Sequence, residues 1–336
     1  MGTCYNWTMQ NQPLRIALLG AGHIAAKMGT TLDFLRWENE IDPYAVASRD
    51  LSKAEALRAE KGFAKAYGSY DDMLADPAVD VVYVATPNSF HYDHVKRCLL
   101  AGKHVLCEKP FTIRTSEAEE LFALAKEKNL FLMEAVWPRF QPIVPKVREA
   151  IASGEIGDPR FLQATFAVAV SGKERLREPS LGGGALLDLG VYALHFTDLY
   201  FGLDGAEIVS SATLSAAGCD DQSTTILRWP DGRMASIMTS MTAALGGYAR
   251  IGGTKGNLEF PGLTLCRSFI RHLLPTGEDR TVECPFDCNG YEYEVRALAK
   301  AIREGRLECE EAPWAATLRV TRLMEDLRRR WGCATV

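Results

Sequence analysis

A short apolar segment that runs into a glycine-rich turn is the feature that most constrains this chain. Residues 14–19 (LRIALL) lead directly into GAGHIA, residues 20–25, where a helical pattern begins. In that context the first glycine permits a tight turn, the second lets the backbone approach a pyrophosphate at a positive helix N-terminus, and the small third residue allows close packing. The alternative is a purely structural turn. We favour a dinucleotide site, contacted by Gly20, Gly22, His23 and Ile24.

The alternation of strand and helix continues through the first 135 residues. Such alternation is typical of a parallel sheet covered by helices on both faces. The sequence therefore predicts an α/β fold that begins with a doubly wound Rossmann domain over residues 1–135. Further strands are expected at 44–48, 81–85, 103–107 and 130–133, and helices near 52–61, 91–101 and 116–128.

The composition and pattern of the sequence change after about residue 150. Segments rich in Thr, Ser, Val, Ile and aromatic residues are separated by turn motifs, and few helical patterns lie between them. At 336 residues the chain exceeds what one core usually organises. We expect residues 136–336 to form an α+β domain with a mostly antiparallel open sheet, which binds substrate and dimerises. Its strands are expected near 160–170, 207–215, 223–229, 233–243, 248–252 and 280–284, and its helices at 291–304 and 314–331.

Charge and composition exclude several classes of protein. The net charge of −5 and the absence of basic runs argue against nucleic acid and membrane partners. The apolar stretch 184–203 contains two aspartates and a histidine and is typical of a buried helix. The polar residues 1–13 resemble neither a signal peptide nor an anchor. The nine scattered cysteines suggest reduced thiols in the cytoplasm, and Cys284 and Cys288 lack the partners that a metal site requires.

The end of the second expected strand bears on the choice of cofactor. An acidic side chain there would accept the ribose hydroxyls of NAD, but the sequence has Ser48, Arg49 and Asp50. A hydroxyl and a guanidinium suit the 2′-phosphate of NADP. In the alternative, Arg49 stacks on adenine and Asp50 binds the ribose. We favour NADP, with NAD possible.

Polar residues also follow the later strands, whose carboxyl ends face a ligand in this kind of sheet. Lys109 stands out, because an ammonium there could bind a substrate oxygen or lower the pKa of a neighbouring acid. The alternative is a salt bridge to Glu108. The other cofactor candidates are Thr86, Pro87, Asn88, His91 and Glu108, and substrate candidates are Trp137 and Arg139.

A second polar group lies within the buried helix. Spacings of four and three place Asp188, Tyr192 and His195 on one stripe. Tyr192 could transfer the proton that accompanies hydride transfer, with Asp188 and Lys109 orienting it, and His195 could contact substrate. The alternative is a polar cluster at a domain interface.

Longer motifs give a family resemblance. The segments ATPNSFH (85–91), AGKHVLCEKP (101–110) and DLGVY (188–192), with the glycine turn, resemble the Gfo/Idh/MocA oxidoreductases. ASRDLS (47–52), FLMEAVW (131–137) and GGALLDLG (183–190) resemble the branch of dimeric dihydrodiol and NADP-dependent D-xylose dehydrogenases. The resemblance is specific through about residue 203 and loose afterwards.

The resemblance implies a nicotinamide cofactor, a catalytic pair at Lys109 and Tyr192 with Asp188 nearby, and a homodimer formed through the open sheet. It also implies hydride transfer at a hydroxyl or carbonyl carbon of a sugar, polyol or cyclic diol. Two alternatives remain open. One is an enzyme that keeps NAD(P) bound and cleaves or interconverts sugars by transient oxidation, and the other is a catalytically silent nucleotide sensor.

Overall fold

The computed structural model describes residues 12–334, which divide into two compact units. The first unit contains the chain up to Thr112 together with Ser116–Trp137 and Asp287–Trp314. The second contains Ile113–Thr115, Pro138–Phe286 and the chain from Ala315. The expected domains were two continuous ranges, whereas the first unit also includes the distant segment Asp287–Trp314.

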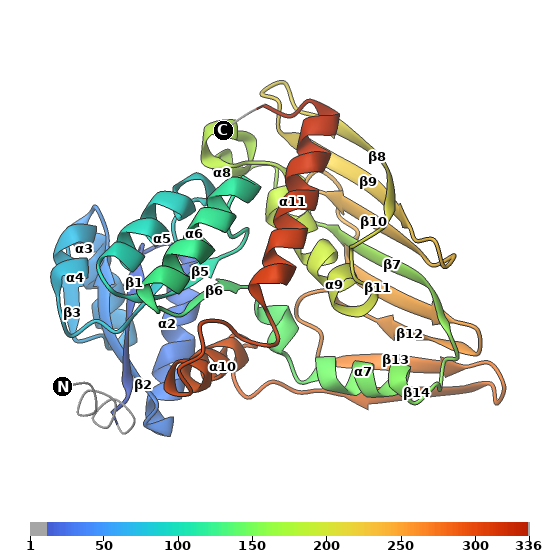
Figure 1. The fold of residues 1–336 in the computed structure, drawn as a ribbon, viewed down its shortest axis with the longest axis horizontal. Coiled ribbons are helices and arrows are strands. Elements are labelled where there is room, and N and C mark those ends of the chain that lie inside the picture. Colours follow the sequence, from blue (N-terminus) through green and yellow to red (C-terminus); the bar gives the residue numbers. More distant parts are fainter. Residues whose placement is uncertain (1–11, 335–336) are drawn as a thin grey trace. The chain divides into compact units, whose positions relative to one another are not determined.

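The first unit is built on a parallel sheet of six strands in the order β3-β2-β1-β4-β5-β6. This order reverses between β1 and β4, which is the switch point where doubly wound folds bind nucleotides. The central strands are buried, because helices cover both faces (Figure 1). The strands are β1 (Leu14–Leu19), β2 (Ile41–Ala47), β3 (Lys65–Tyr67), β4 (Val81–Val84), β5 (His104–Glu108) and β6 (Leu132–Ala135); the helices are α2 (His23–Leu35), η1 (Arg36–Glu38), α3 (Leu51–Lys61), α4 (Tyr70–Ala75), η2 (Asn88–Phe90), α5 (His91–Leu100) and α6 (Thr115–Lys128).

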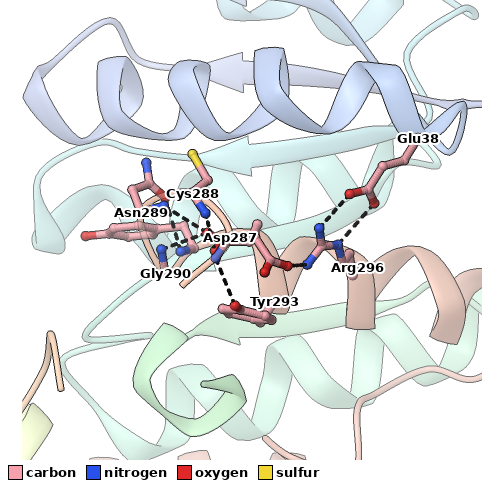
Figure 2. Close-up of polar contacts among 9 residues, drawn as sticks. Glu38, Asp287, Cys288, Asn289, Gly290, Tyr293 and Arg296 are labelled. Atoms are coloured by element: carbon pink, nitrogen blue, oxygen red, sulfur yellow. Dashed lines mark hydrogen bonds and ion pairs between the residues drawn. The ribbon is translucent and has the colours of Figure 1, made fainter. Parts of the chain in front are cut away.

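Helix α10 (Glu292–Arg303) joins the first unit through polar contacts with α2 and η1. Figure 2 shows Arg296 between Glu38 and Asp287; its Nη1 lies 2.6 Å from an Asp287 carboxylate oxygen. The turn before the helix is held by Glu292, whose carboxylate accepts three consecutive backbone N–H groups. Asn289 in that turn accepts a hydrogen bond from Thr31 of α2 at 3.0 Å. These contacts, together with the buried apolar side chains Val295 and Leu298 of α10, attach a segment distant in sequence to the first unit.

The second unit is built on an eight-stranded sheet in the order β14-β13-β12-β11-β7-β10-β9-β8. All its neighbouring strands are antiparallel except β10 and β7, which confirms the expected mostly antiparallel sheet. Strands β12 and β13 were not foreseen. The strands are β7 (Pro159–Ala167), β8 (Glu207–Leu214), β9 (Asp220–Arg228), β10 (Met234–Ser240), β11 (Gly246–Gly253), β12 (Gly256–Phe260), β13 (Ser268–Leu273) and β14 (Glu278–Glu283).

One face of this sheet packs against helices and the other is left open. Residues of α7 (Ile143–Ala152), α9 (Val191–Phe201) and α11 (Trp314–Trp331) share an apolar core with the sheet, and Figure 1 shows these helices on one side of it. The opposite face, called here the open face, exposes the apolar side chains Phe161, Val209, Ile226 and Met238.

Two further observations apply to residues 12–334. In this range no helix has the length and apolar character needed to cross a membrane. Nor does any group of three or more His, Cys, Asp and Glu side chains in the described chain offer a metal site. The described cysteines are all free thiols, and Cys4 and residues 1–11 lie outside the described range.

Candidate cofactor and active site

The glycine turn has the geometry that a dinucleotide phosphate requires. Gly20 has φ of +114°, and a Cβ there would lie 2.7 Å from the carbonyl oxygen of Ala85, so a side chain is excluded. Gly22 is the N-cap of α2, and a Cβ there would meet nothing within 4 Å. His23 is exposed and Ile24 half-buried at the start of the helix. The first-turn N–H groups therefore have room for phosphate oxygens.

After β2, Ser48 and Asp50 form the capping turn of the next helix, whereas Arg49 is exposed. Asp50 is the N-cap of α3, since its Oδ1 accepts hydrogen bonds from the Ser52 amide at 3.1 Å and the Ser52 hydroxyl at 2.6 Å. Ser48 Oγ accepts from the Asp50 amide at 3.2 Å. Arg49 is exposed beside this capping turn. The carboxylate that the NAD alternative assigned to the ribose is thus engaged in capping.

His94, which no sequence motif singles out, lies near Arg49. The Nδ1 atom of His94 is 3.0 Å from Thr86 Oγ1, and its ring contacts Phe90 and Tyr70 with centroids 5.9 and 5.1 Å away. Burial lowers the pKa of His94 to about 4, and the positive charges of Arg97 and Arg49 contribute. His94 is therefore neutral at physiological pH. The only signal for it was its position one helical turn after His91.

His91 links the loops that follow β4 and β5. Its Nδ1 lies 2.8 Å from the Pro110 carbonyl oxygen and its Nε2 lies 2.9 Å from that of Thr86. The ring is fully buried, and burial lowers its pKa. A neutral imidazole donates to one carbonyl at a time. His91 thus holds in register the two loops that carry Pro87, Asn88 and Lys109.

Glu108 supports the backbone of Lys109. One carboxylate oxygen accepts a hydrogen bond from the Tyr83 hydroxyl, and the other accepts from the Lys109 amide at 3.1 Å. Burial raises the pKa of Glu108, while the Lys109 charge opposes that rise. Glu108, expected at the cofactor, is thus a buried neighbour that interacts electrostatically with Lys109.

The segment that carries Asp188 and Tyr192 departs from the expected regular helix. Residues Leu186–Gly190 form a π-helical turn, and α9 begins at Val191. Gly190 fits tightly here, because a Cβ would lie 2.8 Å from Leu186 Cδ1 and 3.2 Å from Thr239 Cγ2. The π turn changes the spacing from which the common polar stripe was inferred. Single π turns inside α-helices often occur at functional sites.

Tyr192 and Asp188 have different surroundings within the second unit. Tyr192 is half-buried and packs edge-on against Phe166, with ring centroids 5.8 Å apart. Asp188 Oδ1 lies 3.2 Å from Arg175 Nη2. Arg175 lies on the short helix α8 (Glu174–Arg177), within the loop 171–180. Lys109 belongs to the first unit.

The three substrate candidates occupy buried positions. Trp137 stacks on Tyr291 with a centroid distance of 4.6 Å inside the first unit. In the second unit, Arg139 Nη1 lies 3.2 Å from Asp198 Oδ2 and 3.5 Å from His195 Nδ1. Asp198 also accepts from Arg319 at 2.8 Å. This burial favours a structural role for Arg139 and His195.

The similarity of this chain to known proteins extends over nearly its whole length. A family model described as "Oxidoreductase family, NAD-binding Rossmann fold" matches residues 14–136, and the GFO/IDH/MocA C-terminal domain matches residues 144–259. Trans-1,2-dihydrobenzene-1,2-diol dehydrogenases of Mus musculus and Homo sapiens are each 34% identical, over 95% of this chain and 97% of theirs. A 3-ketoreductase from Actinomadura kijaniata, solved with NADP and TDP-benzene, superposes with a TM-score of 0.86 at 27% identity, covering 95% of this chain and 98% of that one.

Proposed function

Because the chain belongs to the Gfo/Idh/MocA family of NAD(P)-binding oxidoreductases, we propose that it transfers hydride reversibly at a CH–OH carbon of a sugar, polyol or cyclic diol. The observation that carries the proposal is the open glycine turn at the N-terminus of α2, in a chain whose relatives are named dehydrogenases and reductases. The names of those relatives support a diol or sugar substrate.

NADP is the preferred cofactor in this proposal. Arg49 is exposed at the end of β2, and Asp50 is engaged in capping α3. A free guanidinium favours a phosphate over a ribose hydroxyl. The relative solved with NADP is consistent with this preference. Gly20, Gly22, His23, Ile24, Ser48 and the loop Thr86–Asn88 would hold the rest of the cofactor.

Tyr192 is the proposed proton donor and acceptor. When bound, the nicotinamide supplies or accepts the hydride. An unperturbed tyrosine has a pKa of about 10, so proton exchange at neutral pH requires a nearby cation that stabilises the phenolate. We assign that role to Lys109, which requires its ammonium and the Tyr192 hydroxyl to reach the same substrate oxygen. Asp188 orients the polar groups around Tyr192.

The protein is further proposed to be a cytoplasmic homodimer. The open face exposes apolar side chains on four neighbouring strands, and an uncovered sheet face of this kind is suited to association. The free thiols among residues 12–334 are consistent with a reducing compartment.

A spectrophotometric screen tests the proposal. The purified protein is mixed with NADP or NAD and a panel of aldoses, inositols and cyclic diols, and absorbance of the reduced nicotinamide is followed. We expect reduction of NADP with at least one substrate. Substrate conversion without net NADP reduction would support the enzyme with permanently bound cofactor. Cofactor binding without turnover on the whole panel would support the nucleotide sensor.

A further inference from the structure

Asp220, the first residue of β9, contacts the start of the helix that carries Asp188 and Tyr192. Its side chain is fully buried, and its Oδ2 accepts a hydrogen bond from the Leu186 amide at 2.7 Å. Leu186 is the first residue of the π-helical turn, which continues into α9. Because the first N–H groups of a helix lack partners within it, an acceptor from another element satisfies one of them and fixes where the helix begins.

The glycines before this helix make room for the Asp220 carboxylate. A Cβ on Gly184 would lie 2.2 Å from Asp220 Oδ1, and Gly184 has φ of +120°. A Cβ on Gly183 would lie 2.6 Å from the Leu176 carbonyl oxygen, which accepts the Gly184 amide at 2.9 Å. Gly183 and Gly184 are therefore explained by close packing of the turn against Asp220 and the loop 171–180.

Burial of the Asp220 carboxyl group is costly, so packing alone does not account for it. Its Oδ1 has no hydrogen-bond partner among the described residues. Burial raises the pKa of Asp220 to about 7, although the Leu186 amide and the charge of Arg328 on α11 oppose the rise. The other titratable groups that influence it are Asp221, Cys219 and Cys333. A buried carboxyl that is only half satisfied carries a free-energy cost, so its contact with the helix start calls for a functional reason.

We propose that Asp220 is a positioning residue for proton transfer, which through the Leu186 amide fixes the placement of Asp188 and Tyr192. The inference rests on the proposed role of Tyr192. A small displacement of a reacting group can cost about a hundredfold in rate, so a residue that anchors the helix start acts on turnover without touching substrate. Cofactor affinity depends on residues of the first unit and is not part of this role.

The test compares D220N, D220S and D220A with the matched control D221A. Asn keeps an acceptor for the Leu186 amide, whereas Ser is too short to reach it and Ala has none. Hydrogen exchange followed by mass spectrometry reports on the peptide spanning Leu186–Tyr192. We expect faster exchange of this peptide in D220S and D220A, and exchange close to that of the wild type in D220N and D221A.

Kinetics on the same variants separate positioning from general stability. We expect kcat of D220S and D220A to fall by about tenfold to a hundredfold, with Kd for NADP within about twofold of the wild type and partial or full rescue in D220N. If D220A does not fold, D220S provides the comparison, because it keeps a polar group in the site. Unchanged exchange in D220S, or altered exchange with unchanged kcat, would overturn the inference.

Failure of the proposed function has a different signature. A wild-type protein that binds NADP but turns over nothing on the panel would contradict the oxidoreductase activity. The contact between Asp220 and the helix start would still be decided by the exchange experiment, and the proposed effect on proton transfer would fall with the activity. Loss of both kcat and NADP binding in D220S would show a global defect and contradict a positioning role.

Discussion

The carboxylate of Asp188 pairs with the guanidinium of Arg175, with Oδ1 and Nη2 3.2 Å apart. Asp188 was expected to act through Tyr192 alone, but this pair also ties it to the loop 171–180. The loop is anchored beside the pair, because Leu176 is fully buried and packs in one apolar cluster with Leu189. A carboxylate and a guanidinium side by side can together accept from and donate to neighbouring hydroxyl groups.

Arg175 is therefore expected to affect substrate binding. The variant R175Q keeps a polar side chain but loses the charge and the fork of donors. We expect KM for the substrate to rise by about threefold to thirtyfold, as for one lost charge-assisted hydrogen bond, while Kd for NADP stays unchanged. Arg177 is exposed on the same short helix, so R177Q is the matched control. Equal KM values in R175Q and wild type would contradict the assignment.

Replacement of Arg49 should discriminate between the two cofactors. We expect R49A to weaken NADP binding by about 1 to 3 kcal/mol, the worth of a charge-assisted contact, and to change NAD binding much less. Binding can be measured by calorimetry for each cofactor. K53A removes an exposed cation from the adjacent first turn of α3 and serves as the control. An equal loss for NADP and NAD in R49A would refute recognition of the 2′-phosphate.

Association through the open face is tested by placing charge on it. Val209 and Ile226 are cross-strand partners there and are 61% and 37% exposed. We expect light scattering to give a dimer for the wild type at micromolar concentration and a monomer for V209D/I226K. L100K changes an exposed leucine in the first unit and should remain dimeric. A monomeric wild type would rule out the dimer.

The regular first unit could be predicted from the sequence because its signals are local. Apolar strands, glycine turns and helix formers follow one another, and the expected strand 14–19 matches β1 in the structure. The three-residue strand β3 was missed because it is too short to show periodicity. The second sheet was harder. Strands β12 and β13 were missed although they pair with their neighbours along the chain, because the tendency to form a strand depends strongly on the surrounding sheet.

Residues of the candidate site could be predicted only where they belong to a sequence motif or directly follow an expected strand. The glycine turn, Arg49 and Lys109 follow from position relative to strands. Asp220 could not be found this way, because its role depends on a contact with Leu186, 34 residues away in the chain. The π turn could not be predicted either, because the pattern of apolar residues at 184–203 fits an α-helix equally well.

Asp220 should also make stability depend on pH. Its pKa is raised from 3.8 to about 7, so the folded protein binds this proton more tightly than the unfolded chain does. The stabilisation from the protonated form is complete below about pH 4 and is lost as the pH rises through about 7. We expect D220N to gain stability relative to the wild type between pH 5 and pH 8.5, by on the order of 1 to 4 kcal/mol in urea unfolding. A pH-independent difference would contradict the raised pKa.

Replacing Tyr192 and Lys109 tests the proposed catalytic pair. Y192F keeps the ring and its edge-on contact with Phe166 but removes the hydroxyl. We expect kcat to fall by roughly two to four orders of magnitude, the usual worth of a general acid or base, with little change in Kd for NADP. K109M should lower kcat as well. The double variant should be little worse than either single one, because groups that act as a unit are not additive.

Tyr200 provides the matched control, because it lies on the same helix and Y200F makes the same chemical change. Burial raises the pKa of Tyr200 well above that of an ordinary tyrosine, so it should stay protonated and take no part in proton exchange. We therefore expect Y200F to keep most of its turnover. If Y192F also kept most of its turnover at saturating substrate, the mechanism would fail, and His195 would become the next candidate for the proton. That candidate would need access to substrate, although His195 is only 2% exposed beside Arg139.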